Sequence, residues 1–190
     1  LSIFYLANYG IKTNKFNNLI LHKITKIDSR ISATIKDVYL KLDLNNKEMK
    51  INTEGLKIDL EKNKINFSNI SLTIDLISLL KNDPKIRIAD VETTETDLRS
   101  AISFINSYKL NIPLFVLSSR IQEGTIVAKA KFIFNKDGKI NQKNSKLSGR
   151  INSTKFKLLN DEIINNINLN FELLKNEFYF NNINFEYLNT

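Results

Sequence analysis

Alternation of apolar and polar residues with a period of two is the feature that most constrains how this chain can fold. It is clearest in the segment Ile31–Leu60, where apolar residues occupy every second position in three short runs. The runs are separated by Asn, Lys and Gly residues, which favour turns, and one of these turns is predicted at Thr53-Glu54-Gly55. Successive side chains of a β-strand point to opposite faces, so each run presents one apolar and one charged face. The pattern predicts an antiparallel meander whose function depends on what its apolar face covers.

The alternation slips once inside this segment. The phase of Ile31 and Ile35 does not continue into the phase of Val38 and Leu40. The slip falls at Lys36-Asp37 and predicts a bulge or bend in one long strand. A bend there would let this strand serve two layers of the structure.

Four segments break the strand pattern. In Thr13–Ile27 and Asp97–Tyr108, apolar residues recur at intervals of three and four, which predicts amphipathic helices. The segment Asp75–Lys85 fits one or two helical turns with Asp75 as the N-cap. The segment Asn111–Gln122 is ambiguous, although a proline near its start favours a short helix.

Strands resume after Gly124, with turns predicted at Asn135–Gly138, near Asn160-Asp161 and near Lys175-Asn176. We therefore expect an α+β, mainly β fold. It is a long, twisted antiparallel meander that forms a curved open groove, capped by two or three amphipathic helices.

Composition argues against several classes of function. The net charge is +8, but the lysines alternate with apolar residues along the strands, and no arginine-rich run or RNA-binding motif is present. The chain has no cysteine, and its only histidine, His22, lacks partners for a zinc site. Carboxylates such as Glu92 and Glu95 have no surrounding catalytic groups in the sequence. We predict no catalytic residue, metal, cofactor or nucleic-acid partner, and no enzymatic activity.

The first ten residues, LSIFYLANYG, have two interpretations. Phe4, Tyr5 and Tyr9 suit the aromatic belt where a membrane helix leaves the lipid. An ordinary buried N-terminal helix explains the same residues. On the first interpretation, residues 1–12 are the end of a membrane anchor clipped before Leu1. Because the chain also stops inside an alternating strand, we expect it to be one piece of a longer protein.

The order of these segments resembles the N-terminal region of the AsmA-like family, which includes AsmA-, TamB- and YhdP-type envelope proteins of Gram-negative bacteria. An amphipathic helix leads into IKDVYLKLDL, then EGLKIDL, then NISLTIDLISLLKNDPKIRIADVE. The family has a similar strand-to-helix step, matched here by Ser71–Leu80, followed by a strand like Ile86–Glu92. The later segments GTIVAKAKFIFNKDGKI, LSGRINSTKFKLL and NINLNFELL look like the family's groove strands. The resemblance covers most of the chain and rests on apolar positions and turns.

The resemblance implies an inner-membrane protein with a single N-terminal anchor and the bulk of the chain in the periplasm. Residues 1–12 would end the anchor, and residues 13–190 would form the periplasmic β-groove domain, with a helical insertion around 96–122. Such proteins are implicated in carrying phospholipids from the inner to the outer membrane. The implied function is therefore a bridge-like lipid-transfer protein, active in outer-membrane biogenesis, whose apolar groove carries acyl chains.

The implied lipid-groove residues are apolar side chains on the alternating strands: Val38, Leu40, Leu42, Ile58, Leu60, Phe67, Leu72, Ile74, Phe132, Phe134, Leu169, Phe171, Phe178, Phe180 and Phe185. The implied head-group contacts are the lysines that follow the membrane exit: Lys12, Lys15, Lys23 and Lys26.

Each of these assignments has an alternative. A closed core is the favoured interpretation for apolar residues near the helices, such as Val38, Leu40, Ile74, Leu80 and Ile102. For the Phe-rich later strands, an open apolar face and a closed core are equally supported. A solvated helix face also explains the lysines. The whole chain can alternatively be a non-enzymatic envelope scaffold that binds partner proteins through an exposed sheet edge.

Overall fold

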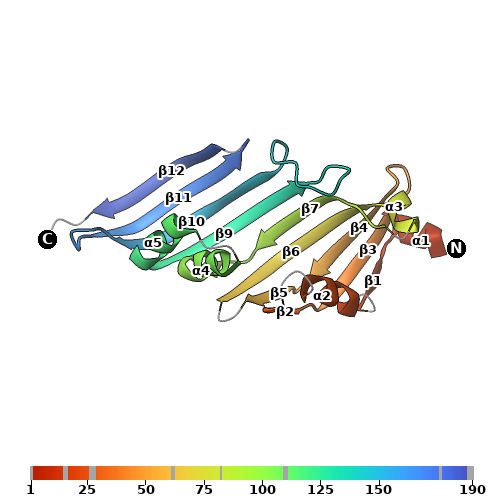
Figure 1. Cartoon of the computed structure of the whole chain (residues 1–190), viewed down its shortest axis with the longest axis horizontal. Coiled ribbons are helices and arrows are strands. Elements are labelled where there is room, and N and C mark those ends of the chain that lie inside the picture. Colours follow the sequence, from red (N-terminus) through yellow and green to blue (C-terminus); the bar gives the residue numbers. More distant parts are fainter. Residues whose placement is uncertain are drawn as a thin grey trace.

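The computed structural model describes residues 2–14, 17–25, 29–60, 63–81, 83–108, 111–175 and 177–187. Within these residues the chain forms one open antiparallel sheet of 12 strands, accompanied by five short helices (Figure 1). The N-terminal and C-terminal strands lie at opposite ends of the sheet, which does not close on itself. The predicted mainly β, open meander with a few helices is confirmed.

The strands within residues 1–60 are short, and those after residue 120 are long. The N-terminal elements are α1 (Ser2–Asn8), β1 (Ile11–Thr13), α2 (Asn17–Thr25), β2 (Ile31–Thr34), β3 (Asp37–Asp43), β4 (Glu48–Glu54), β5 (Lys57–Leu60), β6 (Asn63–Asp75), α3 (Leu76–Leu80) and β7 (Ile86–Thr93). The later elements are β8 (Thr96–Asp97), α4 (Leu98–Tyr108), α5 (Ile112–Arg120), β9 (Ile121–Ile133), β10 (Lys146–Lys157), β11 (Ile163–Leu174) and β12 (Glu177–Tyr187). The main strand order is β1-β3-β4-β6-β7-β9-β10-β11-β12.

The predicted bend at Lys36-Asp37 forms a corner in the sheet. β3 pairs with β4, whereas β2 pairs with β5, and the long strand β6 pairs with both β4 and β5. The backbone N–H of Lys36 donates to the carbonyl of Glu54 at 3.0 Å, which holds the two strands together through the bend. Our prediction of a turn at Thr53–Gly55 is therefore wrong. β4 continues through Glu54, and the chain only bends at Gly55, where φ is +66°.

The helices largely follow their sequence signals. The Asp75 carboxylate accepts a hydrogen bond from the Ser78 N–H at 2.8 Å and so caps α3 as predicted. The Asn111 side chain does the same for α5 by accepting from the Leu114 N–H at 3.1 Å, which explains why this ambiguous segment is helical. α2 is shorter than the predicted helix, because Thr13 pairs with Val38 as part of β1.

Two groups of buried side chains hold the fold together. In one, Leu98 and Ile102 of α4 pack against Ile121, with partly buried Leu114, Ile126, Ile151 and Phe156 around them. This group fixes α4 and α5 on one face of the sheet. The other group lies at the corner, where Val38, Leu56 and Leu60 are almost completely buried.

A glycine in β10 controls how an aromatic ring packs on this face. A Cβ atom at Gly149 would lie 2.5 Å from the Phe171 Cζ and 2.5 Å from the Val127 carbonyl oxygen. We expect Gly149→Ala to destabilise the protein by about 1–3 kcal/mol through overpacking, because the Val127 carbonyl is held in the β9–β10 pairing. Urea denaturation measures the change. The neighbouring Ser148→Ala, on the other face, should alter stability by less than about 0.5 kcal/mol. Equal stability of the two variants would contradict this packing.

Candidate apolar lipid-binding face

The strand register aligns apolar side chains in a row across most of the sheet. In antiparallel pairs, directly opposite residues share a face. One such row crosses β3, β4, β6, β7, β9, β10, β11 and β12 through Val38, Thr53, Ile70, Val91, Ala130, Leu147, Leu173 and Phe178. At a strand spacing of roughly 4.8 Å, this long row extends for about 34 Å. Its one polar member, Thr53, is buried, and its hydroxyl donates to the Ile70 carbonyl at 3.3 Å.

Two shorter rows flank the long row on the same face. One consists of Leu40, Ile51, Leu72, Ala89 and Phe132, in strands β3 to β9. The other consists of Ala128, Gly149, Phe171 and Phe180, in strands β9 to β12. We call the three rows together the apolar face.

The opposite face of the sheet is polar and carries charges of both signs. Asp90 and Glu92 of β7 lie directly opposite Lys131 and Lys129 of β9. The Lys129 Nζ lies 2.8 Å from the Glu92 Oε1. This face is a solvated surface on which opposite charges lie across from each other on neighbouring strands.

The cover over the apolar face decreases along the sheet. Val38 at the corner is 0 % exposed, and Leu40 and Ala89 are also buried. Ile70, Val91, Leu147 and Leu173 are partly buried, whereas Phe178 and Phe180 of β12 are exposed. In Figure 1, α4 and α5 lie over the middle strands, and no helix lies over β12. The face is therefore closed near β3 and open near β12.

Most of the predicted groove residues share this face. They are Val38, Leu40 and Leu42 of β3, Leu72 and Ile74 of β6, Phe132 of β9, Leu169 and Phe171 of β11, and Phe178 and Phe180 of β12. The others lie elsewhere. Ile58 and Leu60 belong to the corner strand β5, and Phe67 lies before a register shift in β6. Phe134 bridges to Ile140 beyond β9, and Phe185 is exposed in β12.

The closed-core interpretation fits the apolar residues near the helices, with one exception. Val38, Leu40, Ile74 and Ile102 are buried as that interpretation requires. Leu80 is 76 % exposed, so its assignment to the core is wrong. The reason lies in α3, which turns Ser78 inward in place of a leucine.

The sequence prediction missed the middle of the long row. Ile70, Val91, Ala130, Leu147 and Leu173 alternate with polar residues as the other strands do, so each strand carried the signal. The sequence of one strand does not determine its register with the next strand, and it is this register that aligns the residues in one row.

The lysines proposed to contact head groups have separate environments. Lys12 lies in β1, and its Nζ is 2.6 Å from the Glu54 Oε2 and 3.2 Å from the Asp37 Oδ2. The hydrogen bond to Glu54, and next the one to Asp37, raise the pKa of Lys12. Hydrogen bonds from Lys12 and Lys36 lower the pKa of Glu54. Lys12 is thus held in an ion-pair cluster. Lys15, Lys26 and the side chain of Lys23 lie outside the described part of the chain.

The residues that the structure describes contain no helix long and apolar enough to cross a membrane, and no group of three or more His, Asp or Glu side chains that could hold a metal ion. Comparison of the chain with protein-family models, with curated proteins and with solved structures finds no match in any of the three.

The Lys12–Glu54 contact predicts a titration shift. Because the folded-state pKa of Glu54 is lowered, its contribution to stability is present above its ordinary pKa of 4.5 and is lost as the pH falls through the folded-state value. We expect Lys12→Met to raise the Glu54 pKa toward 4.5, measured from the pH dependence of its side-chain carboxyl carbon shift by NMR. Lys136→Met, in the distant β9–β10 loop, should leave this pKa unchanged. An unchanged pKa in Lys12→Met would rule out the contact.

Proposed function

We propose that this chain is part of a membrane-anchored periplasmic lipid-transfer protein whose apolar face carries phospholipid acyl chains between the inner and outer membranes. The observation that carries the proposal is the long row, which continues across eight strands and loses its cover toward β12. The expected resemblance to AsmA-like proteins points to the same function.

The physical chemistry of the face suits an acyl chain better than a compact ligand. Each methylene removed from water contributes about 0.8 kcal/mol, so a long chain lying on a continuous row gains at every position. The row crosses the strands, so a lipid can lie across several of them without interrupting any backbone pairing. Its polar head group would remain at the solvent-exposed margin. Soluble proteins rarely leave a large contiguous apolar surface uncovered unless it binds something.

The membrane assignment has separate support at the N-terminus. Phe4 and Tyr5 of α1 and Tyr9 after it are exposed, and the rings of Tyr5 and Tyr9 lie 5.2 Å apart. Aromatic side chains in such a position suit a membrane interface. α1 lies beside β3 at the N-terminal end of the sheet (Figure 1). An anchor continuing from α1 would therefore place this end of the sheet at the inner membrane.

One observation favours a second candidate, the envelope scaffold. β12 pairs only with β11 among the described strands, and its side chains are exposed along its whole length. A strand from a partner protein can add to such an edge. This function would use the edge of β12 rather than the apolar face.

Photocrosslinking from β12 distinguishes the two functions. Phe180 and Tyr179 are aromatic neighbours with similar exposure, 56 % and 48 %, but Phe180 lies opposite Phe171 on the apolar face and Tyr179 lies opposite Glu172 on the polar face. We expect p-benzoylphenylalanine at position 180 to form phospholipid adducts in cells, detected by mass spectrometry, several-fold more often than at position 179. Equal adducts, or none at position 180, would refute lipid binding by this face. Protein adducts at both positions would support the scaffold.

A further inference from the structure

Helix α3 turns a polar side chain toward the interior and apolar side chains toward solvent. Its Ser78 is buried, where the hydroxyl donates to the Asp75 carbonyl at 2.7 Å and accepts from the Lys85 N–H at 2.9 Å. Ile77 and Leu80 are 46 % and 76 % exposed, and their spacing of three residues puts them on one side of the helix. A surface helix of a globular protein normally turns its apolar side toward the core. The outward apolar side of α3 is therefore expected to contact another molecule.

The turn between β3 and β4 extends this apolar surface. The backbone N–H of Leu76, at the start of α3, donates to the carbonyl of Lys47 in this turn at 2.9 Å. Leu44 in the same turn is half exposed, and it lines one hollow together with the exposed Phe4 of α1. Figure 1 shows α1 and α3 at the N-terminal end of the sheet. We call Phe4, Leu44, Ile77, Leu80 and their surroundings the N-terminal tip.

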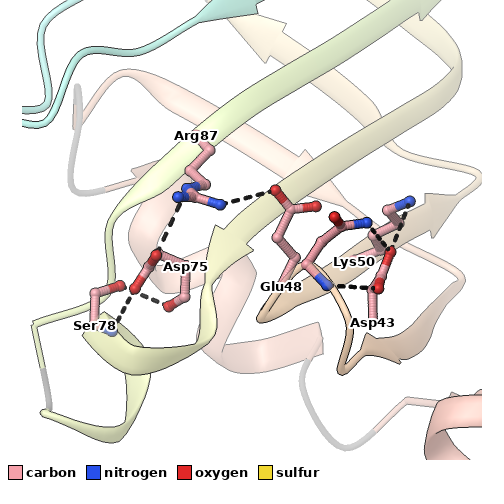
Figure 2. Close-up of polar contacts among 7 residues, drawn as sticks. Asp43, Glu48, Lys50, Asp75, Ser78 and Arg87 are labelled. Atoms are coloured by element: carbon pink, nitrogen blue, oxygen red, sulfur yellow. Dashed lines mark hydrogen bonds and ion pairs between the residues drawn. The ribbon is translucent and has the colours of Figure 1, made fainter.

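The carboxylates of the tip are already paired. Arg87 bridges two of them, with its Nη1 3.0 Å from the Glu48 Oε1 and its Nε 3.6 Å from the Asp75 Oδ2 (Figure 2). Asp43 contacts Lys50 at 3.9 Å in the same view. Nearby, Asp83 contacts Lys85 at 3.7 Å. Each of these four carboxylates contacts a cationic side chain, and because Arg87 serves two of them the contacts leave one negative charge unbalanced.

Several lysines of the tip have no such partner. Lys41 and Lys50 line the hollow beside Leu44, and Lys81 and Lys136 line another of about 330 Å³ beside Ile77. Of these, Lys41, Lys81 and Lys136 form no ion pair within the described residues, and the same holds for Lys47 in the β3–β4 turn. The tip thus combines exposed apolar side chains with surplus positive charge.

We propose that the N-terminal tip docks directly on an anionic bilayer surface, with Leu44, Ile77 and Leu80 entering the acyl region and the unpaired lysines facing lipid phosphates. Interfacial binding depends on buried apolar area together with attraction to anionic lipids, and the tip supplies both. The inference deepens the proposed function by naming the membrane contact, and it requires no anchor helix. A protein partner would have to match both the apolar side chains and four lysines.

The absence of tryptophan from the chain gives a direct test. In Leu80→Trp the new side chain is the only indole, and its emission should shift to the blue when vesicles of phosphatidylcholine with phosphatidylglycerol are added. It should shift less with phosphatidylcholine alone. The matched control is Leu159→Trp, at a turn beyond β10 where the native leucine is 88 % exposed, and its emission should not change. No shift for Leu80→Trp, or equal shifts for the two variants, would overturn the proposal.

The charge contribution is tested by vesicle sedimentation. Lys47→Gln combined with Lys81→Gln should weaken binding to the anionic vesicles by about 25-fold, because each lysine near a charged surface contributes about fivefold to the affinity. Lys57→Gln combined with Lys64→Gln removes the same charge from exposed positions in β5 and β6, and should bind as the wild type does. Equal binding by the two double variants would overturn a specific role for the tip.

Failure of docking and failure of the lipid-binding face give different results. The p-benzoylphenylalanine probe at position 180 can be combined with Ile77→Ser and Leu80→Ser and supplied with phospholipid in detergent micelles. If the adduct forms while vesicle binding is lost, both the docking and the lipid-binding face are supported. If the variant binds vesicles as the wild type does, the docking is overturned, and the adduct alone then decides the proposed function.

Discussion

Cross-strand register is the constraint on which the rest of this structure depends, because a slip of one residue would move all apolar side chains of a strand to the polar face. The register is regular where the long row crosses the sheet and irregular beside it. β6 and β7 shift on both sides of the segment that contains Ile70, and β10 and β11 shift beyond Ile151. Ser153 and Asn166, which have positive φ, lie at these irregularities. These irregularities lie outside the long row, so the alignment of its residues is kept.

Local features of this fold could be predicted from the sequence, whereas features that depend on strand partners could not. The alternation, the bend at Lys36-Asp37 and the Asp75 cap each depend on neighbouring residues, and each was predicted. The turn predicted at Thr53–Gly55 does not form, because the backbone of Lys36, eighteen residues before Glu54 in the chain, hydrogen-bonds to Glu54 and keeps β4 extended. Leu80 was assigned to the core because leucine usually is buried. Hydrogen bonds of Ser78 with Asp75 and Lys85 instead fix the opposite orientation of α3.

The positive charge of the chain divides into two kinds of environment that composition cannot separate. On the polar face, lysines meet carboxylates, as Lys129 meets Glu92 and Lys12 meets Glu54. These exposed pairs add little stability, and they bring opposite charges together on a solvated surface. At the N-terminal tip the carboxylates contact arginine and lysine side chains, whereas Lys47 and Lys81 form no ion pair with any residue that the structure describes. The location of unpaired charge is therefore more informative about partners than the net charge of +8.

The uneven cover of the apolar face constrains any route for lipid along it. Val38 is completely buried beside the corner strands, so an acyl chain cannot lie over the start of the long row without displacing them. Ile70 and Val91 are partly buried, and the face is open at Phe178. If the tip docks on a bilayer, lipid taken from that bilayer must join the row beyond the corner. Entry from the side of the sheet, past Leu72 and Phe132 in the flanking row, satisfies this requirement without unfolding the corner. Under the proposed function, the buried corner is the closed end of the face, and lipid that joins the row beyond it would move toward β12.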